Sequence, residues 1–268
     1  MGARLKDKVA IITGGASGIG KAIAKAFAQE GATVVLAARN VANLEQTAKE
    51  LQAMGGKVKT IPTDVKDEKQ IINMVAETIK TFGKIDILVN NSGIGGPTAN
   101  VVDLKLEEWN EILMVDLTGS MLCAREVLKH MIPRKSGNII NLGAEGGRSG
   151  DGRSGYPMRA GYCCAKMGVI GLTETLAQEV GEYSIRVNCI SAAAVKGDRF
   201  VRVITGRANA MGIPFEDALK REMVNYSLLR PAEEYELANC AVYLASDESS
   251  AITGQTIVNH CGQHISFK

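Results

Sequence analysis

The chain has 268 residues, of which 46% are hydrophobic and 22% charged, and its formal net charge is +2. This length suits one large α/β domain with a substantial core and is short for two. The balanced charge without a Lys/Arg run argues against a nucleic-acid-binding protein, and no apolar stretch approaches the roughly 18 residues of a membrane span.

Apolar runs of strand length alternate with segments of helical periodicity along the chain. The expected strands are residues 9–13, 33–37, 58–63, 85–89, 138–142, 185–190 and 256–258. The expected helices are residues 21–30, 41–54, 70–82, 106–131 and 162–180. Strands that alternate with helices need crossover connections, which predict a doubly wound parallel α/β sheet of about seven strands with helices on both faces. We expect a single domain over residues 1–268, with a substrate lid around residues 199–227.

The segment TGGASGIG, residues 13–20, follows the first expected strand and opens the first expected helix. Its glycines allow a tight turn and a close approach to a pyrophosphate, and the helix start offers unpaired N–H groups. This context predicts a dinucleotide site of the Rossmann type. The residues expected to contact the nucleotide here are Gly14, Ser17, Gly18, Ile19 and Gly20.

The end of the second expected strand indicates which nucleotide binds. An acidic side chain there would bond the adenosine 2′-hydroxyl, whereas a basic one suits a 2′-phosphate. The sequence has Ala38 and then Arg39, so no carboxylate repels a phosphate and a guanidinium can pair with it. This favours NADP(H) over NAD(H). The alternative is that Arg39 is a solvated loop residue that stacks on adenine.

Four motifs in this order and spacing resemble the short-chain dehydrogenase/reductase family. They are TGGASGIG, Asp64-Val65, NNSG at residues 90–93, and Tyr162-x-x-x-Lys166. The closing segment LASDESSAITGQTIV is similar to that family's last helix and strand. The resemblance covers nearly the whole chain, and the motifs are specific as a set although none would be alone.

The resemblance implies that Tyr162 is the general acid/base for a substrate hydroxyl or carbonyl. Lys166 would bond the nicotinamide ribose and make the phenol more acidic. A free phenol ionises near pH 10, so it needs a nearby cation to act as a base at neutral pH. A spacing of four residues places that ammonium on the same helix face. Further cofactor contacts are implied for Asp64, Val65, Asn90, Gly93 and Val195.

The sequence departs from the family pattern where the catalytic set usually includes a serine and an asparagine. Ala144 occupies the serine position and Asp116 the asparagine position, where it could contribute to the proton relay. Ser149 lies thirteen residues before Tyr162 and gives a second alignment, in which it takes the serine's role. We favour the alignment that loses the serine, because the strand register before Ala144 is clear.

These features predict an NADP(H)-dependent oxidoreductase that interconverts a carbonyl and a secondary alcohol. The altered positions motivate an alternative: an isomerase, lyase or cyclase in the same fold, or a nucleotide-sensing binding protein. The expected partner is a small-molecule carbonyl or alcohol substrate. The family resemblance also implies a homo-oligomer, a tetramer or dimer, in which helices 106–131 and 162–180 pair between subunits.

The six cysteines match no zinc or redox spacing, and a chain of this size needs no disulfide bonds. They are Cys123, Cys163, Cys164, Cys189, Cys240 and Cys261. We expect reduced thiols in a cytoplasmic protein without a metal site.

Overall fold

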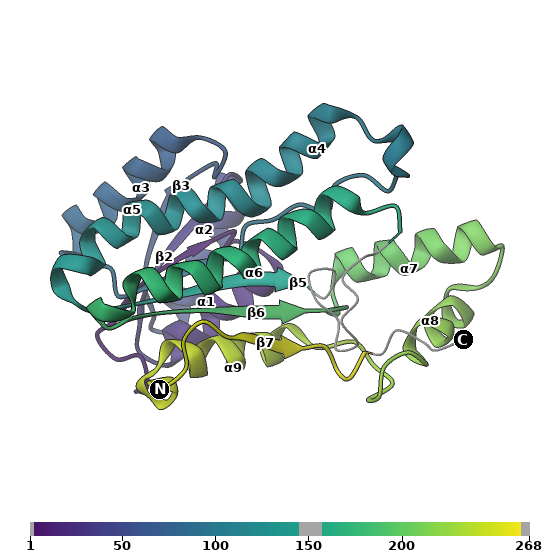
Figure 1. The fold of residues 1–268 in the computed structure, drawn as a ribbon. Helices are drawn as coiled ribbons and strands as arrows, with labels where there is room; N and C mark the ends of the chain where they lie inside the picture. The colour runs from purple at the N-terminus through teal and green to yellow at the C-terminus, as the bar shows by residue number, and fades with distance from the viewer. Residues whose placement is uncertain (1–2, 145–156, 264–268) are drawn as a thin grey trace.

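The computed structural model describes residues 3–144 and 157–263, and its centre is a seven-stranded parallel sheet (Figure 1). The strand order is β3-β2-β1-β4-β5-β6-β7. The strands are β1 (Val9–Thr13), β2 (Thr33–Ala38), β3 (Lys57–Pro62), β4 (Ile87–Asn90), β5 (Gly137–Ala144), β6 (Ile185–Ala192) and β7 (Thr256–Asn259). The predicted doubly wound parallel sheet is confirmed.

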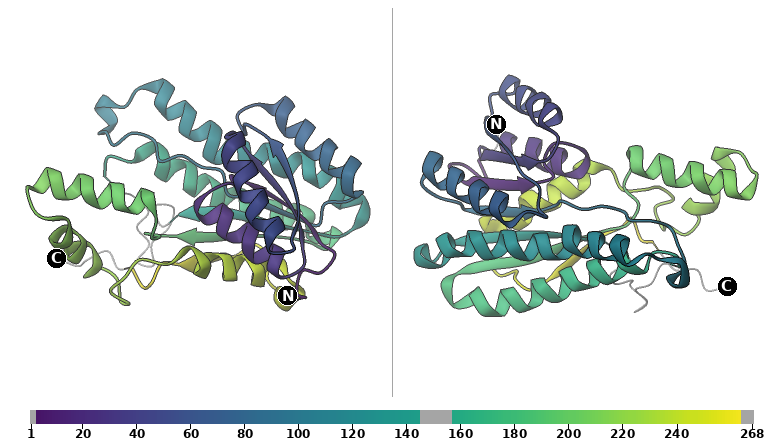
Figure 2. Two further views of the ribbon diagram at one scale, coloured as in Figure 1. Left: turned by 180° about the vertical axis from the view of Figure 1, so that it is seen from behind. Right: turned by 90° about the horizontal axis from the view of Figure 1, so that it is seen from above.

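Helices cover both faces of the sheet (Figure 2). One layer consists of α1 (Gly18–Gln29), α2 (Val41–Ala53) and α9 (Glu234–Ala245). The other consists of α3 (Glu68–Phe82), α4 (Leu106–Leu113), α5 (Gly119–Arg134) and α6 (Ala160–Val180). Successive strand side chains point to opposite faces, so Ile12 packs under the first layer and Ile11 under the second. A strand buried on both faces must be apolar throughout, which is why β1 reads VAIIT.

The helix expected over residues 106–131 is longer and less regular than predicted. A π-helical segment, Met114–Thr118, joins α4 to α5, and α5 continues through Pro133 to Arg134. A proline so near the end of a helix removes a single helical hydrogen bond, so the helix continues past it. The other expected elements end within three residues of those in the structure.

Beyond the carboxyl end of the sheet, α7 (Asp198–Met211) and α8 (Phe215–Met223) pack against each other (Figures 1 and 2). Their buried side chains form a small apolar cluster of Ile204, Ala208 and Ala218. We call these two helices the α7–α8 hairpin. They occupy the segment for which the sequence predicts a lid.

The sheet places a ligand site at the carboxyl ends of β1 and β4. These central strands are neighbours, and the connections that follow them run to opposite sides of the sheet. Ligands of open α/β sheets bind in the crevice at such a switch point. Among the helices in the described part of the chain, none combines the length and apolarity needed to cross a bilayer.

Candidate active site

The loop between β1 and α1 has a backbone that only small residues can adopt. Gly14 and Gly18 have φ values of +64° and +53°. A Cβ on Gly20 would lie 2.3 Å from the carbonyl oxygen of Gly14, so the loop closes on the first turn of the helix. The loop therefore fits a diphosphate, because its glycines place no side chains beside the N–H groups at the start of α1.

The end of β4 holds this loop in place. The Asn91 side chain donates to the carbonyl oxygens of Thr13 and Gly14 at 3.0 and 3.2 Å. The Thr13 hydroxyl oxygen accepts from the N–H groups of Asn91 and Ser92 at 3.0 and 3.1 Å. The NNSG motif thus fixes the glycine loop, and sequence reasoning did not assign this role to Asn91 or Thr13.

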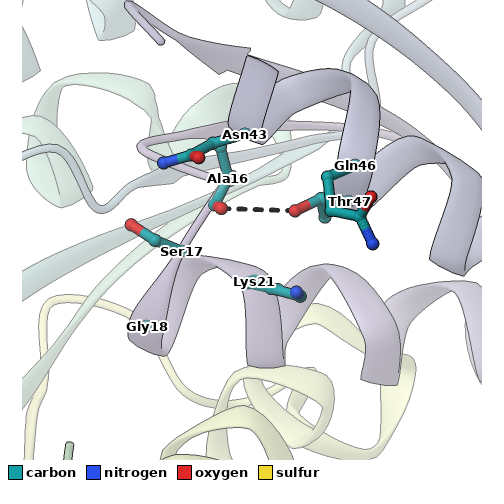
Figure 3. A pocket seen from close by; sticks show the side chains of 7 residues that line it. All are labelled: Ala16, Ser17, Gly18, Lys21, Asn43, Gln46 and Thr47. Carbon is teal, nitrogen blue, oxygen red and sulfur yellow. Dashed lines mark hydrogen bonds between the residues drawn. The ribbon is translucent and has the colours of Figure 1, made fainter. Parts of the chain in front are cut away.

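A pocket of about 270 Å³ lies between the start of α1 and α2 (Figure 3). Its lining residues are Ala16, Ser17, Gly18, Lys21, Asn43, Gln46 and Thr47. The Thr47 hydroxyl donates to the Ala16 carbonyl oxygen at 3.2 Å and so ties α2 to the glycine loop. Ser17, Asn43 and Gln46 give the pocket a polar lining that hydrogen-bonding ligand groups can use.

The residues predicted to bind the adenosine half follow neighbouring strands. Arg39 is exposed directly after Ala38, the last residue of β2. Asp64 and Val65 follow β3; the Asp64 carboxylate accepts from the Lys66 N–H at 3.0 Å, and Val65 is buried. All of these residues lie at the carboxyl edge of the sheet, on the same side of β1.

A buried ion pair lies beneath the end of β5. The Lys166 ammonium donates to the Leu142 carbonyl oxygen at 3.0 Å and lies 3.2 Å from Oδ2 of Asp116. The two side chains are only 7% and 0% exposed. Oδ1 of Asp116 accepts from the Ile94 N–H at 2.7 Å. Oδ2 lacks hydrogen-bond geometry toward Lys166, so their attraction is electrostatic.

The π-helical segment determines where Asp116 lies. Such single-turn insertions are frequent at functional sites, because they rotate the residues that follow relative to an α-helix. Here the insertion contains Asp116, the residue that the sequence predicts at the family's asparagine position. Asp116 is 1% exposed, and its charge is held deep between α6 and the segment after β4.

Tyr162 and Lys166 share one face of α6, as their spacing predicts. The Lys166 Nζ lies 5.8 Å from the centroid of the Tyr162 ring, and the Arg159 guanidinium carbon lies 5.1 Å from it. A Cβ on Gly93 would lie 3.1 Å from Oδ2 of Asp116 and 3.4 Å from the Lys166 Nζ. Tyr162, Lys166, Asp116 and Gly93 therefore form one cluster.

Buried amides connect this cluster to the central sheet. The Asn90 side chain donates to Oδ1 of Asn141 at 3.0 Å and to the Ser120 carbonyl oxygen at 3.1 Å. The Asn141 side chain in turn donates to the Thr173 hydroxyl at 2.9 Å. This chain of bonds sets α6 against β4 and β5. The sequence pointed to Asn90 alone, because Asn141 and Thr173 belong to no motif that we singled out.

Ala144 ends β5 opposite Ala192, the last residue of β6, so no side-chain hydroxyl is available at that position. Ser149 lies outside the described residues, and its catalytic role stays a prediction. Val195 pairs with Ala232 in a short parallel bridge beyond β6, which brings the expected cofactor contact to the start of α9.

Among the described residues, no three His, Cys, Asp or Glu side chains gather as metal ligands would. Cys189 of β6 is a buried thiol within the electrostatic reach of Lys166. Burial raises its pKa to about 11, although the Gly143 N–H and the Lys166 charge lower it in part. This thiol is protonated at neutral pH and is not a nucleophile.

A family model described as short chain dehydrogenase matches residues 8–208. The chain belongs to this family. Over 254 residues it is 36% identical to the 3-oxoacyl-acyl-carrier-protein reductase FabG of Thermotoga maritima, covering 95% of this chain and 96% of the relative.

Solved structures agree with the assignment. A variant of actinorhodin polyketide ketoreductase with NADPH superposes with a TM-score of 0.89 and 30% identity, over 98% of each chain. An NAD+-bound xylitol dehydrogenase gives a TM-score of 0.90 and 28% identity, over 97% of this chain and 100% of the other. These relatives support carbonyl/alcohol redox chemistry with a nicotinamide cofactor.

Proposed function

We propose that this chain is an NADP(H)-dependent oxidoreductase that interconverts a carbonyl and a secondary alcohol, with Tyr162 as general acid/base. The observation that carries the proposal is the phenol of Tyr162 beside the buried ammonium of Lys166. A nearby cation favours the phenolate and lets the oxygen exchange a proton near neutral pH. When bound, the nicotinamide supplies or accepts the hydride.

The chain's own residues bind, orient and move the proton. Tyr162 gives its proton to a carbonyl oxygen in reduction and takes one from a hydroxyl in oxidation. Lys166 is held by Leu142 and Asp116, so its charge stays fixed relative to the phenol. Fixing both reactants in attack geometry supplies much of the rate. Because Ala144 has no hydroxyl, a second donor to the substrate oxygen has to come from elsewhere, and Ser149 is the predicted candidate.

Arg39 supports NADP(H) as the cofactor. Its guanidinium is exposed directly after β2, where a carboxylate would instead bond the 2′-hydroxyl. The loop residues Gly14, Ser17, Gly18, Ile19 and Gly20 would hold the diphosphate, and Asp64, Val65, Asn90, Gly93 and Val195 complete the proposed contacts. The NADPH-bound relative is consistent with this choice, while the NAD+-bound one shows that the fold accepts either form.

The test is oxidation of NADPH, with NADH in parallel, against a mixed panel of ketones. We expect faster turnover with NADPH and a loss of at least about a hundredfold in Tyr162→Phe, because general acid/base catalysis contributes roughly 10²–10⁴. Tyr162→Phe should still bind the cofactor, which fluorescence titration checks. Turnover that survives in the variant would contradict the role given to Tyr162.

A second function is favoured by Ala144 and Asp116. Without the hydroxyl, and with a carboxylate beside Lys166, the site could use Tyr162 as a base in an isomerase, lyase or cyclase, or serve nucleotide sensing. NADPH that binds tightly but is not consumed with any carbonyl of the panel would support this alternative over the redox proposal.

We also infer that the chain forms one domain in which the α7–α8 hairpin is the substrate lid.

We further infer that the chain forms a homo-oligomer through α4, α5 and α6. Met121 of α5, Met167 of α6 and Met114 of the π-helical segment between α4 and α5 are exposed, as an interface would require. A monomer mass in light scattering would contradict the oligomer.

The six free cysteines support a reducing compartment, the cytoplasm.

A further inference from the structure

Glu234, the first residue of α9, faces two segments that are distant in sequence. Its carboxylate oxygen Oε1 lies 3.7 Å from the position that a Cβ on Gly18 would take. The same oxygen lies 3.2 Å from the corresponding position at Gly197. Gly18 opens α1 in the nucleotide loop, and Gly197 directly precedes α7. The half-buried carboxylate therefore lies between the proposed diphosphate site and the base of the α7–α8 hairpin.

The neighbouring acidic residues have other partners. Glu233 pairs with the Lys196 ammonium at 3.1 Å, and Glu236 pairs with Arg230 at 2.7 Å. Glu236 also accepts from the Glu233 N–H at 2.8 Å, which fixes the first turn of α9. The Glu234 carboxylate has no hydrogen bond or ion pair within the described part of the chain. It is held in place by the turn and not by a counter-ion.

The charges around Glu234 favour its protonated form. Burial, together with the carboxylates of Asp198 and Glu233, raises the pKa of Glu234 above its usual value. Lys21 and Lys25 of α1 lower it in part, and both of these ammonium groups are engaged by Glu50 at 2.7 and 2.8 Å. A bound diphosphate would add negative charge on the same side and oppose the ionised carboxylate further.

We propose that Glu234 limits cofactor affinity when it is ionised, so that binding of the dinucleotide takes up a proton at this residue. The inference rests on the proposed function, because it takes the loop at Gly18 as the diphosphate site. By linkage, a ligand that binds the protein better when Glu234 is protonated raises the proton affinity of the Glu234 carboxylate in the complex. Affinity is then highest at low pH and falls as pH rises through the range in which free Glu234 ionises.

The test is isothermal calorimetry with NADP+ and NAD+ from pH 4 to 9, in pairs of buffers with different ionisation enthalpies. The pairs report the protons taken up on binding, and NAD+ separates Glu234 from the 2′-phosphate, which itself titrates near pH 6. The variants are Glu234→Gln and, as a matched control, Glu233→Gln, whose carboxylate pairs with Lys196.

We expect Glu234→Gln to bind both nucleotides roughly three- to tenfold more tightly at pH 8–9, to converge with the natural chain at low pH, and to lose most of the proton uptake. Glu233→Gln should stay within about twofold of the natural chain, since its charge is already compensated. Weaker binding by Glu234→Gln, or unchanged proton uptake, would overturn the inference while leaving the cofactor proposal intact. If the natural chain binds neither nucleotide, both proposals fail.

Discussion

At the scale of single residues, Asp116 is the position where the sequence predicts a charged residue in place of the family's asparagine. A carboxylate 3.2 Å from the Lys166 ammonium offsets part of the positive field at Tyr162. The same carboxylate accepts a hydrogen bond from the Ile94 N–H and so fixes the position of the segment that carries Gly93. We therefore propose that Asp116 positions Lys166 and also limits how strongly Lys166 acts on the phenol.

Asp116→Asn should separate these two effects, because the amide keeps the shape and the bond from Ile94 but removes the charge. We expect the rising limb of the pH–rate profile for alcohol oxidation to move to lower pH, because no carboxylate then opposes the charge of Lys166 at the phenol. Asp116→Ala is the control, since it also loses the bond to Ile94 and should lower the rate at all pH values. A profile that does not move in Asp116→Asn would exclude the electrostatic role.

The residues of the site divide by how they could be predicted. Tyr162 and Lys166 are readable from sequence because their contact follows from local helix geometry. The glycine loop is readable because its backbone demands small residues. The direct pairing of Asp116 with Lys166, the Asn141–Thr173 bond and the approach of Glu234 to Gly18 are tertiary contacts, and no local pattern encodes them.

At the scale of elements, Asp86 joins the amino ends of two central strands to the end of α5. Its carboxylate accepts from the Val9 N–H at 2.8 Å, from Arg134 at 2.6 Å, and from Lys84 at 2.9 Å. Burial alone would raise the pKa of Asp86, but Arg134, the Val9 N–H and Lys84 outweigh it and hold that pKa below its usual value. The ionised form therefore stabilises the fold.

Asp86→Asn should lower the free energy of unfolding by roughly 2–4 kcal/mol at pH 7, because Arg134 and Lys84 lose their buried partner. In the natural chain this stabilisation is present above the unfolded pKa of about 3.9 and is lost as pH falls through the lower folded pKa. Urea unfolding between pH 3 and 7 measures both effects. The exposed Asp103→Asn is the control, and equal stability of the two variants would contradict the assignment.

The predicted strands and helices agree with the structure where the hydrophobic pattern of the segment is clear. The central strands β1 and β2 are short apolar runs, VAIIT and TVVLAA, and the bounds of all seven strands shift by no more than two residues. Residues 106–131 were predicted as one regular helix. The structure has α4, a π-helical segment and α5 there, and the sequence does not reveal the π-helical segment because it changes the hydrogen bonding without changing the composition. The predicted end at Met131 is three residues short, because α5 tolerates Pro133 in its last turn and continues to Arg134.

At the scale of the molecule, the α7–α8 hairpin stands apart from the rest of the chain. Its apolar cluster of Ile204, Ala208 and Ala218 is separate from the two clusters that flank the sheet. A small independent core gives a low free energy of local opening. The sheet and its layers, in contrast, share large continuous cores on both faces.

Hydrogen exchange should report this difference. We expect amides of residues 198–223 to exchange at least about a hundredfold faster than those of β1, β4 and β5, and to slow when NADPH and a substrate analogue bind. Mass spectrometry of peptic fragments measures both, with the sheet peptides as the internal control. Equal protection of the hairpin and the sheet would show that the hairpin opens only with the whole fold.

The separate core of the hairpin also bears on how such a protein can change over generations. Mutations that reshape α7 and α8 alter packing among a few side chains near Ile204 and leave the glycine loop, the amide chain and the ion pair untouched. Selection for a new substrate can therefore act on one short segment while the machinery for hydride chemistry is inherited unaltered. A fold built in this way is suited to diversify into many activities.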